Sequence, residues 1–291
     1  MVSRVALRLG LRTFDDTALL VMAIVNRTPD SFYDKGATFG DDAALAAVDR
    51  AVEDGADIID VGGVKAGPGA DVDTDEEIRR VAPFVAAVRA RHPDVVVSVD
   101  TWRAEVARAC LGEGADVVND AWGGVDPRLA EVTAAADAAM VCTHAGHVTP
   151  RTRPHRIGYD DIVGDVIATT VGLAEQAVAA GVARESLLID PGHDFGKNTW
   201  HSLEVTRRLP EMVATGWPVL MSLSNKDFVG ESLDRAVPER LTGTLATTAL
   251  TAWMGARVFR AHNVRETRDT LDMVATIRGD RPPAVTRRGL V

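Results

Sequence analysis

The run Leu19-Leu20-Val21-Met22-Ala23-Ile24-Val25 is followed at once by Asn26-Arg27-Thr28-Pro29-Asp30-Ser31-Phe32. An unbroken apolar run of this length predicts a buried strand. The polarity then changes within one residue to an amide, a cation, a hydroxyl and a carboxylate. Barrels and open parallel sheets present their chemistry in such loops, although Thr-Pro-Asp is also ordinary turn chemistry. The pattern of the remaining chain separates these two interpretations.

Seven further strand-like runs follow, and a helix-like stretch comes after each strand. The predicted strands are 19–25, 58–61, 95–99, 117–119, 138–142, 187–190, 219–222 and 257–261. The predicted helices are 42–53, 75–91, 104–113, 127–135, 160–180, 202–209, 238–254 and 264–276. Gly55, Gly114 and Gly255 each stand where a left-handed residue ends a helix before a strand. Eight such units predict a closed (β/α)8 TIM barrel, since open sheets usually have fewer strands.

The domain organisation follows from the absence of any linker rich in glycine, proline or serine. We predict one domain over residues 1–291, with the barrel core at about 18–277. Residues 3–17 alternate between apolar and polar side chains and predict a short N-terminal hairpin. The tail 279–291 is expected to be disordered.

Composition and charge exclude several classes of function. The net charge of −10 argues against a general nucleic-acid or anionic-membrane surface. Cys110 and Cys142 make neither a disulfide framework nor a cysteine metal site, and a reducing cytoplasm is the expected location. The first ten residues lack the long apolar core of a signal peptide, and no apolar run approaches the ~18 residues of a membrane span.

Polar or ionisable residues occur at almost every predicted strand end. They are Asn26, Asp60, Asp100-Thr101, Asn119-Asp120, Thr143-His144, Asp190 with His193 to Lys197, Ser224-Asn225-Lys226, and Arg260 with His262. Any single one of them could be a cap or turn residue. As a ring, they predict a binding or active site at the carboxyl ends of the strands, where barrel enzymes carry their function.

Four of these residues suit a planar heterocycle. The carboxylates of Asp100 and Asp190 accept the N–H groups of an amino-amide edge, and Asn119 supplies both a donor and an acceptor. Lys226 can meet a carbonyl oxygen or a ring nitrogen. Buried in a barrel mouth, such contacts discriminate strongly, because a wrong ring leaves them unpaired.

Other residues at the strand ends suit an anion and a metal ion. Arg260 and His262 lie on one face of the last strand and suit a phosphate, and the side-chain oxygen of Asn26 suits a hard cation that carries a diphosphate. A metal hydrolase is an alternative, with ligands at the histidines His144, His147 and His193. Barrel hydrolases usually have His-x-His at the first strand end, where this chain has Asn26.

These residues resemble the dihydropteroate synthases, within the pterin-binding barrel superfamily, over nearly the whole chain from about Leu20 to Met273. The family condenses a dihydropterin diphosphate with p-aminobenzoate, releases diphosphate with the help of Mg²⁺, and is usually dimeric. The motifs that carry the resemblance are Asn26-x-Thr28-Pro29-Asp30-Ser31-Phe32, Asp60-Val61-Gly62-Gly63, Ser98-Val99-Asp100-Thr101, Val118-Asn119-Asp120, Asp190-Pro191-Gly192 with Phe195-Gly196-Lys197, Ser224-x-Lys226-x-Phe228 and Arg260-x-His262-x-Val264.

The resemblance implies a role for each matching residue. Asp100, Asn119, Asp190 and Lys226 would hold the pterin. Asn26, Arg260 and His262 would hold the diphosphate, with Asn26 on its Mg²⁺. The implied catalytic residues are Asn26, Asp34, Lys226 and Arg260. A small pterin-like ligand and a homodimer through the late helices, 238–254 and 264–273, are the expected partners.

The departures from the family pattern are concentrated in the loops. The second loop of the family usually reads Gly-Gly-Glu-Ser-Thr-Arg-Pro-Gly, and here it is Gly62-Gly63-Val64-Lys65-Ala66-Gly67-Pro68-Gly69. The threonine and arginine positions have thus become Ala66 and Gly67. The other departures are Arg27 and Lys35 in the first loop, Thr143, Asp194 and Asn225.

We therefore expect a dihydropteroate synthase homologue with impaired or absent activity that retains weak binding of a pterin or a sulfone-type ligand. Loss of one preorganised donor to the leaving diphosphate costs roughly 10²–10³ in rate. A working synthase, with positive charge restored by Arg27, Lys35 or Lys65, is one alternative. A non-catalytic interaction or regulatory protein is another. A pterin-dependent methyltransferase is a further alternative, but no second cofactor domain is present.

Overall fold

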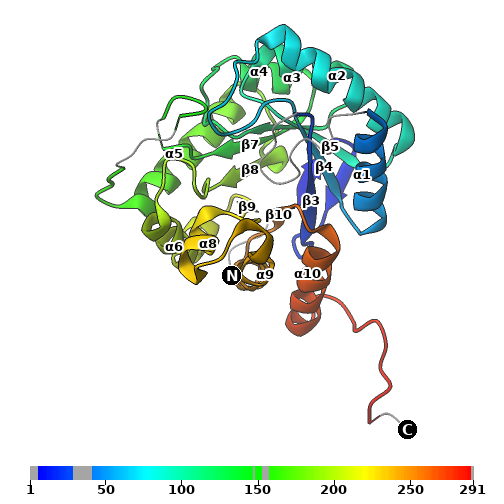
Figure 1. Cartoon of the computed structure of the whole chain (residues 1–291), viewed down its shortest axis with the longest axis vertical. Coiled ribbons are helices and arrows are strands. Elements are labelled where there is room, and N and C mark those ends of the chain that lie inside the picture. The colour runs from blue at the N-terminus through cyan, green and yellow to red at the C-terminus, as the bar shows by residue number, and fades with distance from the viewer. Residues whose placement is uncertain (1–5, 29–40, 147, 153–156, 290–291) are drawn as a thin grey trace.

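The computed structural model describes residues 6–28, 41–146, 148–152 and 157–289 (Figure 1). Its main sheet has eight parallel strands in the order β8-β7-β6-β5-β4-β3-β10-β9. The strands are β3 (Leu20–Asn26), β4 (Ile58–Gly62), β5 (Val96–Asp100), β6 (Val117–Asp120), β7 (Ala139–Thr143), β8 (Leu187–Asp190), β9 (Leu220–Ser222) and β10 (Val258–Ala261). A parallel bridge between Ile189 and Val219 joins the two edge strands. The predicted TIM barrel is confirmed.

Helices form the outer layer of the barrel (Figure 1). They are α1 (Asp41–Glu53), α2 (Thr74–Arg91), α3 (Ala104–Gly112), α4 (Leu129–Ala135), α5 (Ile162–Ala179), α6 (Thr199–Arg207), α7 (Leu209–Val213), α8 (Asp227–Leu233), α9 (Leu241–Met254) and α10 (Val264–Arg278), with short 3₁₀ turns at Arg184–Ser186 and Val237–Glu239.

The prediction for the helices was incomplete at two places. The stretch predicted as one helix over 202–209 contains α6 and α7, and Pro210 lies in the first turn of α7. Proline lacks the N–H that would continue α6. Helix α8 was not predicted, because seven residues are too few to show a helical period.

The two ends of the chain are attached to the barrel differently. The predicted N-terminal hairpin is present as β1 (Leu7–Leu9) and β2 (Arg12–Phe14), which pair antiparallel. Leu7, Leu9 and Phe14 are buried in the same cluster as the apolar residues of the barrel interior, so the hairpin closes the amino end of the barrel. At the other end, residues 280–289 carry no helix or strand and extend from α10.

The barrel interior changes from apolar to polar along the strands. Side chains alternate between the interior and the helix layer, because the period of a strand is two residues. Val96 belongs to the interior apolar cluster, and Ser98 and Asp100 are the next interior positions of β5. Leu188 is followed by Asp190, and Val258 by Arg260 and then His262. The base of the barrel is therefore apolar and its mouth polar.

Helix α5 is long and apolar enough to cross a membrane by length and composition, contrary to the expectation that no such run exists. Its buried residues Ile162, Val163, Val166, Ala174 and Ala177 lie in the apolar cluster between strands and helices. A core helix of a barrel satisfies the same criterion as a membrane span. We assign α5 to the barrel wall.

The loops after β7 and β8 cross backbone to backbone, and glycine makes this crossing possible. Gly192 has a φ of +63° and Gly196 a φ of +55°. A Cβ on Gly192 would collide with the carbonyl oxygen of His144, and one on Gly196 would lie 2.6 Å from the carbonyl oxygen of Ala145. Packing therefore requires the glycine of the Asp190-Pro191-Gly192 motif, independently of the chemistry that the Asp190 carboxylate performs.

We predict that Gly192→Ala lowers the free energy of unfolding by about 2 kcal/mol or more, since it adds left-handed strain and a backbone collision. Thermal unfolding should show a drop of about 4 °C or more. Gly172→Ala is the matched control, because Gly172 lies within α5 with nothing near its added Cβ. That change should stabilise the helix slightly. Equal melting temperatures for the two variants would contradict this account.

Candidate functional site

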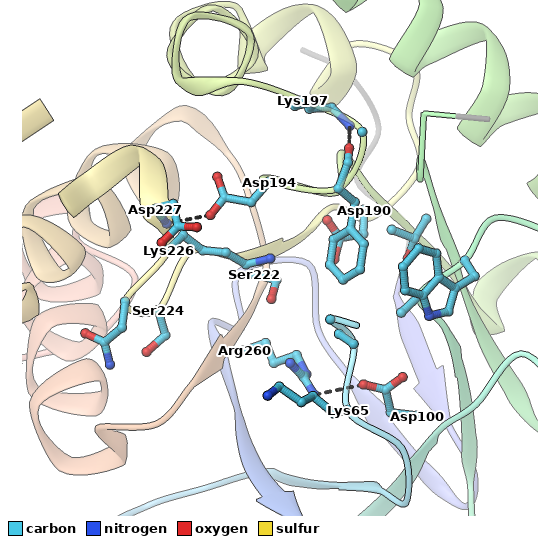
Figure 2. A pocket seen from close by; sticks show the side chains of 18 of the residues that line it. Lys65, Asp100, Asp190, Asp194, Lys197, Ser222, Ser224, Lys226, Asp227 and Arg260 are labelled. Atoms are coloured by element: carbon cyan, nitrogen blue, oxygen red, sulfur yellow. Dashed lines mark hydrogen bonds and ion pairs between the residues drawn. The ribbon is translucent and has the colours of Figure 1, made fainter. Parts of the chain in front are cut away.

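A cavity of about 410 Å³ opens at the polar mouth of the barrel (Figure 2). All eight barrel strands, or the loops directly after them, contribute to its lining. The structure brings together there all but one of the predicted site residues, namely Asn26, Asp100, Asn119, Asp190, Lys226, Arg260 and His262. The remaining predicted catalytic residue, Asp34, lies outside the described residues.

Asp60 belongs to the predicted ring of strand-end residues but was given no role there, and it organises the floor of the cavity. It is fully buried, and its carboxylate accepts hydrogen bonds from three groups. These are Ser98 Oγ at 2.6 Å, Asn119 Nδ2 at 3.3 Å and Arg260 Nε at 2.6 Å. The signal for it was the period of β4, which places Asp60 on the interior face two residues after Ile58.

Arg260 is held between two carboxylates. Its Nε donates to Asp60, and its Nη2 donates to Asp100 Oδ2 at 3.0 Å (Figure 2). The guanidinium charge is thus largely balanced within the protein. This arrangement differs from the independent anion contact that the sequence suggested for Arg260.

His262 lines the cavity beside Arg260 as a neutral imidazole. Its Nδ1 lies 3.0 Å from Ser224 Oγ, and its backbone N–H donates to the same oxygen at 3.2 Å. Burial, together with the charges of Arg260 and Lys226, lowers the pKa of His262 to about 3. At neutral pH it can offer an anion a hydrogen bond but no charge.

Lys226 and Asp190 form the opposite side of the floor. Lys226 extends into the cavity, donates from Nζ to the carbonyl oxygen of His193 at 2.7 Å, and lies 4.5 Å from the ring centroid of Phe195 (Figure 2). Asp190 Oδ1 accepts the backbone N–H of Gly192 at 2.7 Å. Burial lowers the pKa of Lys226 and raises the pKa of Asp190. A ligand that displaces water from the cavity therefore changes the protonation equilibrium of both groups.

Asp194 has a role that the sequence did not predict. Its backbone has a φ of +65°, and its Oδ2 accepts the backbone N–H of Asp227 at 2.5 Å (Figure 2). Asp227 is the first residue of α8, whose amino-terminal N–H groups have no partner within the helix. The carboxylate of Asp194, a departure from the family pattern, therefore caps a helix from a neighbouring loop.

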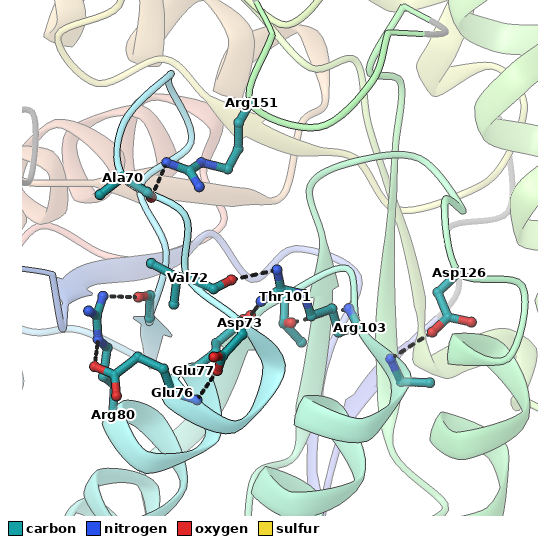
Figure 3. Close-up of polar contacts among 12 residues, drawn as sticks. Ala70, Val72, Asp73, Glu76, Glu77, Arg80, Thr101, Arg103, Asp126 and Arg151 are labelled. Carbon is teal, nitrogen blue, oxygen red and sulfur yellow. Dashed lines mark hydrogen bonds and ion pairs between the residues drawn. The ribbon is translucent and has the colours of Figure 1, made fainter.

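The loop after β4, residues 63–73, is fixed by arginines that lie outside it (Figure 3). Their guanidinium groups donate to its carbonyl oxygens: Arg80 to Gly63 at 3.1 Å, Arg151 to Ala70 at 2.9 Å and Arg103 to Val72 at 2.7 Å. Ala66 and Gly67 line the cavity without a polar side chain, and Lys65 is the cation of this loop. The loop keeps its place but presents no arginine to a ligand.

The other two cations considered as replacements differ in position. Arg27 follows β3 on the side of the helix layer, with its guanidinium carbon 4.6 Å from the ring centroid of Phe84 in α2. It is not among the described residues that line the cavity. Arg27 therefore does not restore the charge of the missing loop arginine. Lys35 lies outside the described residues.

The histidines considered as metal ligands have protein partners. His144 Nδ1 lies 2.6 Å from Lys197 Nζ, and its Nε2 lies 2.7 Å from Asp165 Oδ1. His193 Nε2 lies 2.8 Å from Thr206 Oγ1, and His147 is outside the described part of the chain. Within the described ranges, no group of three or more His, Cys, Asp or Glu side chains is placed to hold a metal ion.

An aromatic wall completes the cavity. Trp102 and Trp122 meet edge to face with ring centroids 6.2 Å apart, and Trp122 meets Phe195 in the same way at 5.1 Å. All three rings line the cavity. Trp122 is held by Asp120, whose Oδ1 accepts its backbone N–H at 3.1 Å. The sequence did not reveal this wall, although both tryptophans follow predicted strand ends by three residues.

Asp100 provides a test of the electrostatics of this floor. Burial raises its pKa to about 7, against the lowering effect of Arg260. The folded protein thus holds a proton that the unfolded chain releases near pH 4, so the free energy of unfolding falls as pH rises from about 4 to about 7. We predict an NMR titration midpoint near 7 for this carboxyl, and a flatter pH dependence of stability in Asp100→Asn.

Asp126 is the control carboxylate for that titration, since its hydrogen bond with Arg128 lowers its pKa to about 2. It should remain charged throughout the range in which Asp100 titrates. A midpoint near 4 for Asp100, or an unchanged pH dependence in Asp100→Asn, would overturn the assignment. Because the Asp126–Arg128 pair lies outside the cavity lining, the comparison isolates the effect of the barrel mouth.

Comparison with known proteins identifies the family of this fold and site. Residues 22–262 match the family described as "Pterin binding enzyme". The chain is 60% identical to a Mycobacterium leprae protein named "Inactive dihydropteroate synthase 2", over 93% of this chain and 94% of that one. It is 38% identical to the dihydropteroate synthase of Haemophilus influenzae, over 86% and 91% of the two chains.

The structure of the Yersinia pestis dihydropteroate synthase in complex with a sulfonamide drug superimposes with a TM-score of 0.89, at 34% identity, over 95% of this chain and 100% of that one. The chain belongs to the pterin binding enzyme family, and it is similar there both to dihydropteroate synthases and to a homologue that is named inactive.

Proposed function

We propose that this protein is a dihydropteroate synthase homologue that binds a pterin-like ligand in the barrel mouth and has lost the condensing activity. One observation carries the proposal. The loop after β4 brings Ala66 and Gly67 to the cavity, while the guanidinium of Arg260 is engaged by Asp60 and Asp100. The Mycobacterium leprae relative, which is named inactive, supports the same conclusion.

The pterin half of the site is complete. Asp100, Asn119, Asp190 and Lys226 all line the cavity and offer a mixed set of acceptors and donors. The aromatic wall of Trp102, Trp122 and Phe195 stands beside them. This combination of a flat apolar surface and a few convergent polar groups is typical of a site for a planar heterocycle.

The diphosphate half is weakened by its charges. Among the described residues, the cavity lining carries five carboxylates, Asp100, Asp190, Asp194, Asp227 and Glu231, against four cations, Lys65, Lys197, Lys226 and Arg260. Lys197 is buried and bonded to His144 and to carbonyl oxygens of its own loop. Lys65 is a point charge without the planar fork of arginine. A leaving diphosphate would therefore receive little stabilisation.

Magnesium would enter this site only together with a diphosphate. Asn26 offers one side-chain oxygen. Gly62 lies between Asn26 and Asp100 and has no side chain of its own. A Cβ on Gly62 would lie 3.6 Å from Asn26 Oδ1 and 3.9 Å from Asp100 Oδ2. Mg²⁺ is usually bound by one or two protein ligands, several waters and the phosphates of its substrate. Asn26 fits this mode and does not by itself make a resident metal site.

We predict that the purified protein turns over dihydropterin diphosphate and p-aminobenzoate, with Mg²⁺, at least about 100-fold more slowly than the Haemophilus influenzae enzyme assayed in parallel. Calorimetry should still detect binding of 6-hydroxymethyl-dihydropterin, and Asp190→Asn should abolish it. Turnover within tenfold of the control enzyme would refute the loss of activity.

A double variant, Ala66→Thr with Gly67→Arg, tests the cause of that loss. It restores the two side chains of the family loop, so the affinity for the diphosphate should rise while the affinity for the pterin without diphosphate stays the same. No change in diphosphate affinity would mean that the loop is not the cause. The binding of a sulfone drug should be measured by the same calorimetry, as a second class of ligand.

We also propose a homodimer through α9 and α10, which pack against each other along the barrel (Figure 1). Leu250 and Trp253 of α9 and Met273 and Ile277 of α10 are large apolar side chains left exposed. Such side chains grouped on neighbouring helices are typical of an interface. Leu271, which lies in the predicted helix 264–273, is fully buried against the barrel and does not belong to this surface.

Trp253→Glu should convert the dimer into a monomer, because it places a charge at an apolar interface. Light scattering coupled to size exclusion should report the mass of two chains for the wild type and of one chain for the variant. Leu11→Glu is the control, since Leu11 is exposed on the hairpin at the amino end of the barrel. A wild type that is monomeric at high concentration would rule out the interface.

A further inference from the structure

Thr143 lies at the floor of the cavity with an unused hydroxyl. It is the last residue of β7 and pairs in register with Asp190 of β8. Val141, two residues earlier, belongs to the interior apolar cluster, so Thr143 also points into the barrel. Its side chain lines the cavity and is 2% exposed, and its Oγ1 has no hydrogen-bond partner among the described residues.

Other buried threonines of the molecule show the usual arrangement. Five of those in helices donate to carbonyl oxygens one turn earlier: Thr133 to Leu129, Thr170 to Val166, Thr206 to Ser202, Thr251 to Thr247 and Thr267 to Asn263. Among the described residues, the solvent-inaccessible threonine hydroxyls without a hydrogen-bond partner are those of Thr28 and Thr143, and both residues line the cavity.

An unpaired buried hydroxyl is costly, since it has given up water without gaining another partner. Solvent does not reach the oxygen of Thr143 in this conformation. The methyl group of Thr143 lies toward Gly192, and a rotation about χ1 changes which of the two groups, hydroxyl or methyl, faces the cavity. A ligand on the floor of the cavity can thus receive the hydroxyl as a donor or an acceptor.

We propose that Thr143 is a specificity-determining residue of this site. Its hydroxyl hydrogen-bonds a polar atom on the edge of the bound heterocycle, next to the edges that Asn119 and Asp190 contact. The cavity then selects rings that carry a nitrogen or oxygen at that edge and rejects rings with a C–H or methyl group there. The inference rests on the proposed pterin-type function and adds to it the ring edge that this protein reads.

Thr143→Val is the decisive variant, because valine keeps the shape of threonine and removes only the hydroxyl. We expect opposite effects on stability and on binding. Without ligand, the variant should melt about 2 °C or more above the wild type, since it no longer buries an unpaired hydroxyl. With 6-hydroxymethylpterin as the probe, calorimetry should show binding about fivefold to tenfold weaker than in the wild type. Thr143→Ser should restore most of the affinity.

A series of pterins that each lack one ring nitrogen, the ring carbonyl oxygen or the exocyclic amino group then locates the contact. For one member of the series, wild type and Thr143→Val should bind equally, because the partner atom is gone. If Thr143→Val binds every pterin as tightly as the wild type, the hydroxyl does not contact the ligand and the inference is wrong. If the wild type binds no pterin at all, the proposed function itself fails, and that outcome is distinct from the first.

Discussion

The buried carboxylate of Asp60 is the contact on which the mouth of this barrel depends. It lies two residues beyond the apolar base of β4 and collects hydrogen bonds from β5, β6 and β10 through Ser98, Asn119 and Arg260. A buried carboxylate is tolerated only when it is paired and hydrogen-bonded, so these partners are fixed with it. Asp60 thereby ties together three strands and sets the positions of two residues that face the cavity.

This contact explains how a barrel can keep a ligand floor after losing a reaction. Removing Arg260 would leave the buried carboxyl groups of Asp60 and Asp100 without their cation, and removing Asp60 would deprive Arg260 of one of its two buried partners. These residues therefore stabilise the fold whether or not the protein catalyses the condensation. The side chains of the loop after β4 have no such second role, because arginines outside the loop hold its backbone. Substitutions such as Ala66 and Gly67 can accumulate there without loss of the fold.

Most of the architecture was predictable because a strand and a helix each leave a period in the sequence. The eight apolar runs mark the strands to within about a residue, and the polar residues after them mark the mouth. Short or irregular elements escaped, such as α8, and so did the role of Asp194, which caps that helix from the preceding loop. A cap supplied across a loop leaves no local pattern, since donor and acceptor are 33 residues apart in the chain.

The sequence by itself determined the barrel, its N-terminal hairpin and the set of residues at its mouth, because these depend on local periodicity and on the order of the elements. It also showed which loop positions had lost their polar side chains. Only the tertiary structure assigned the partners. Arg260 engages two aspartates, Arg27 points to the helix layer, and the hydroxyl of Thr143 is left unpaired in the cavity wall. Pairing depends on the distances between strands that are remote in sequence, and those distances exist only once the barrel has closed.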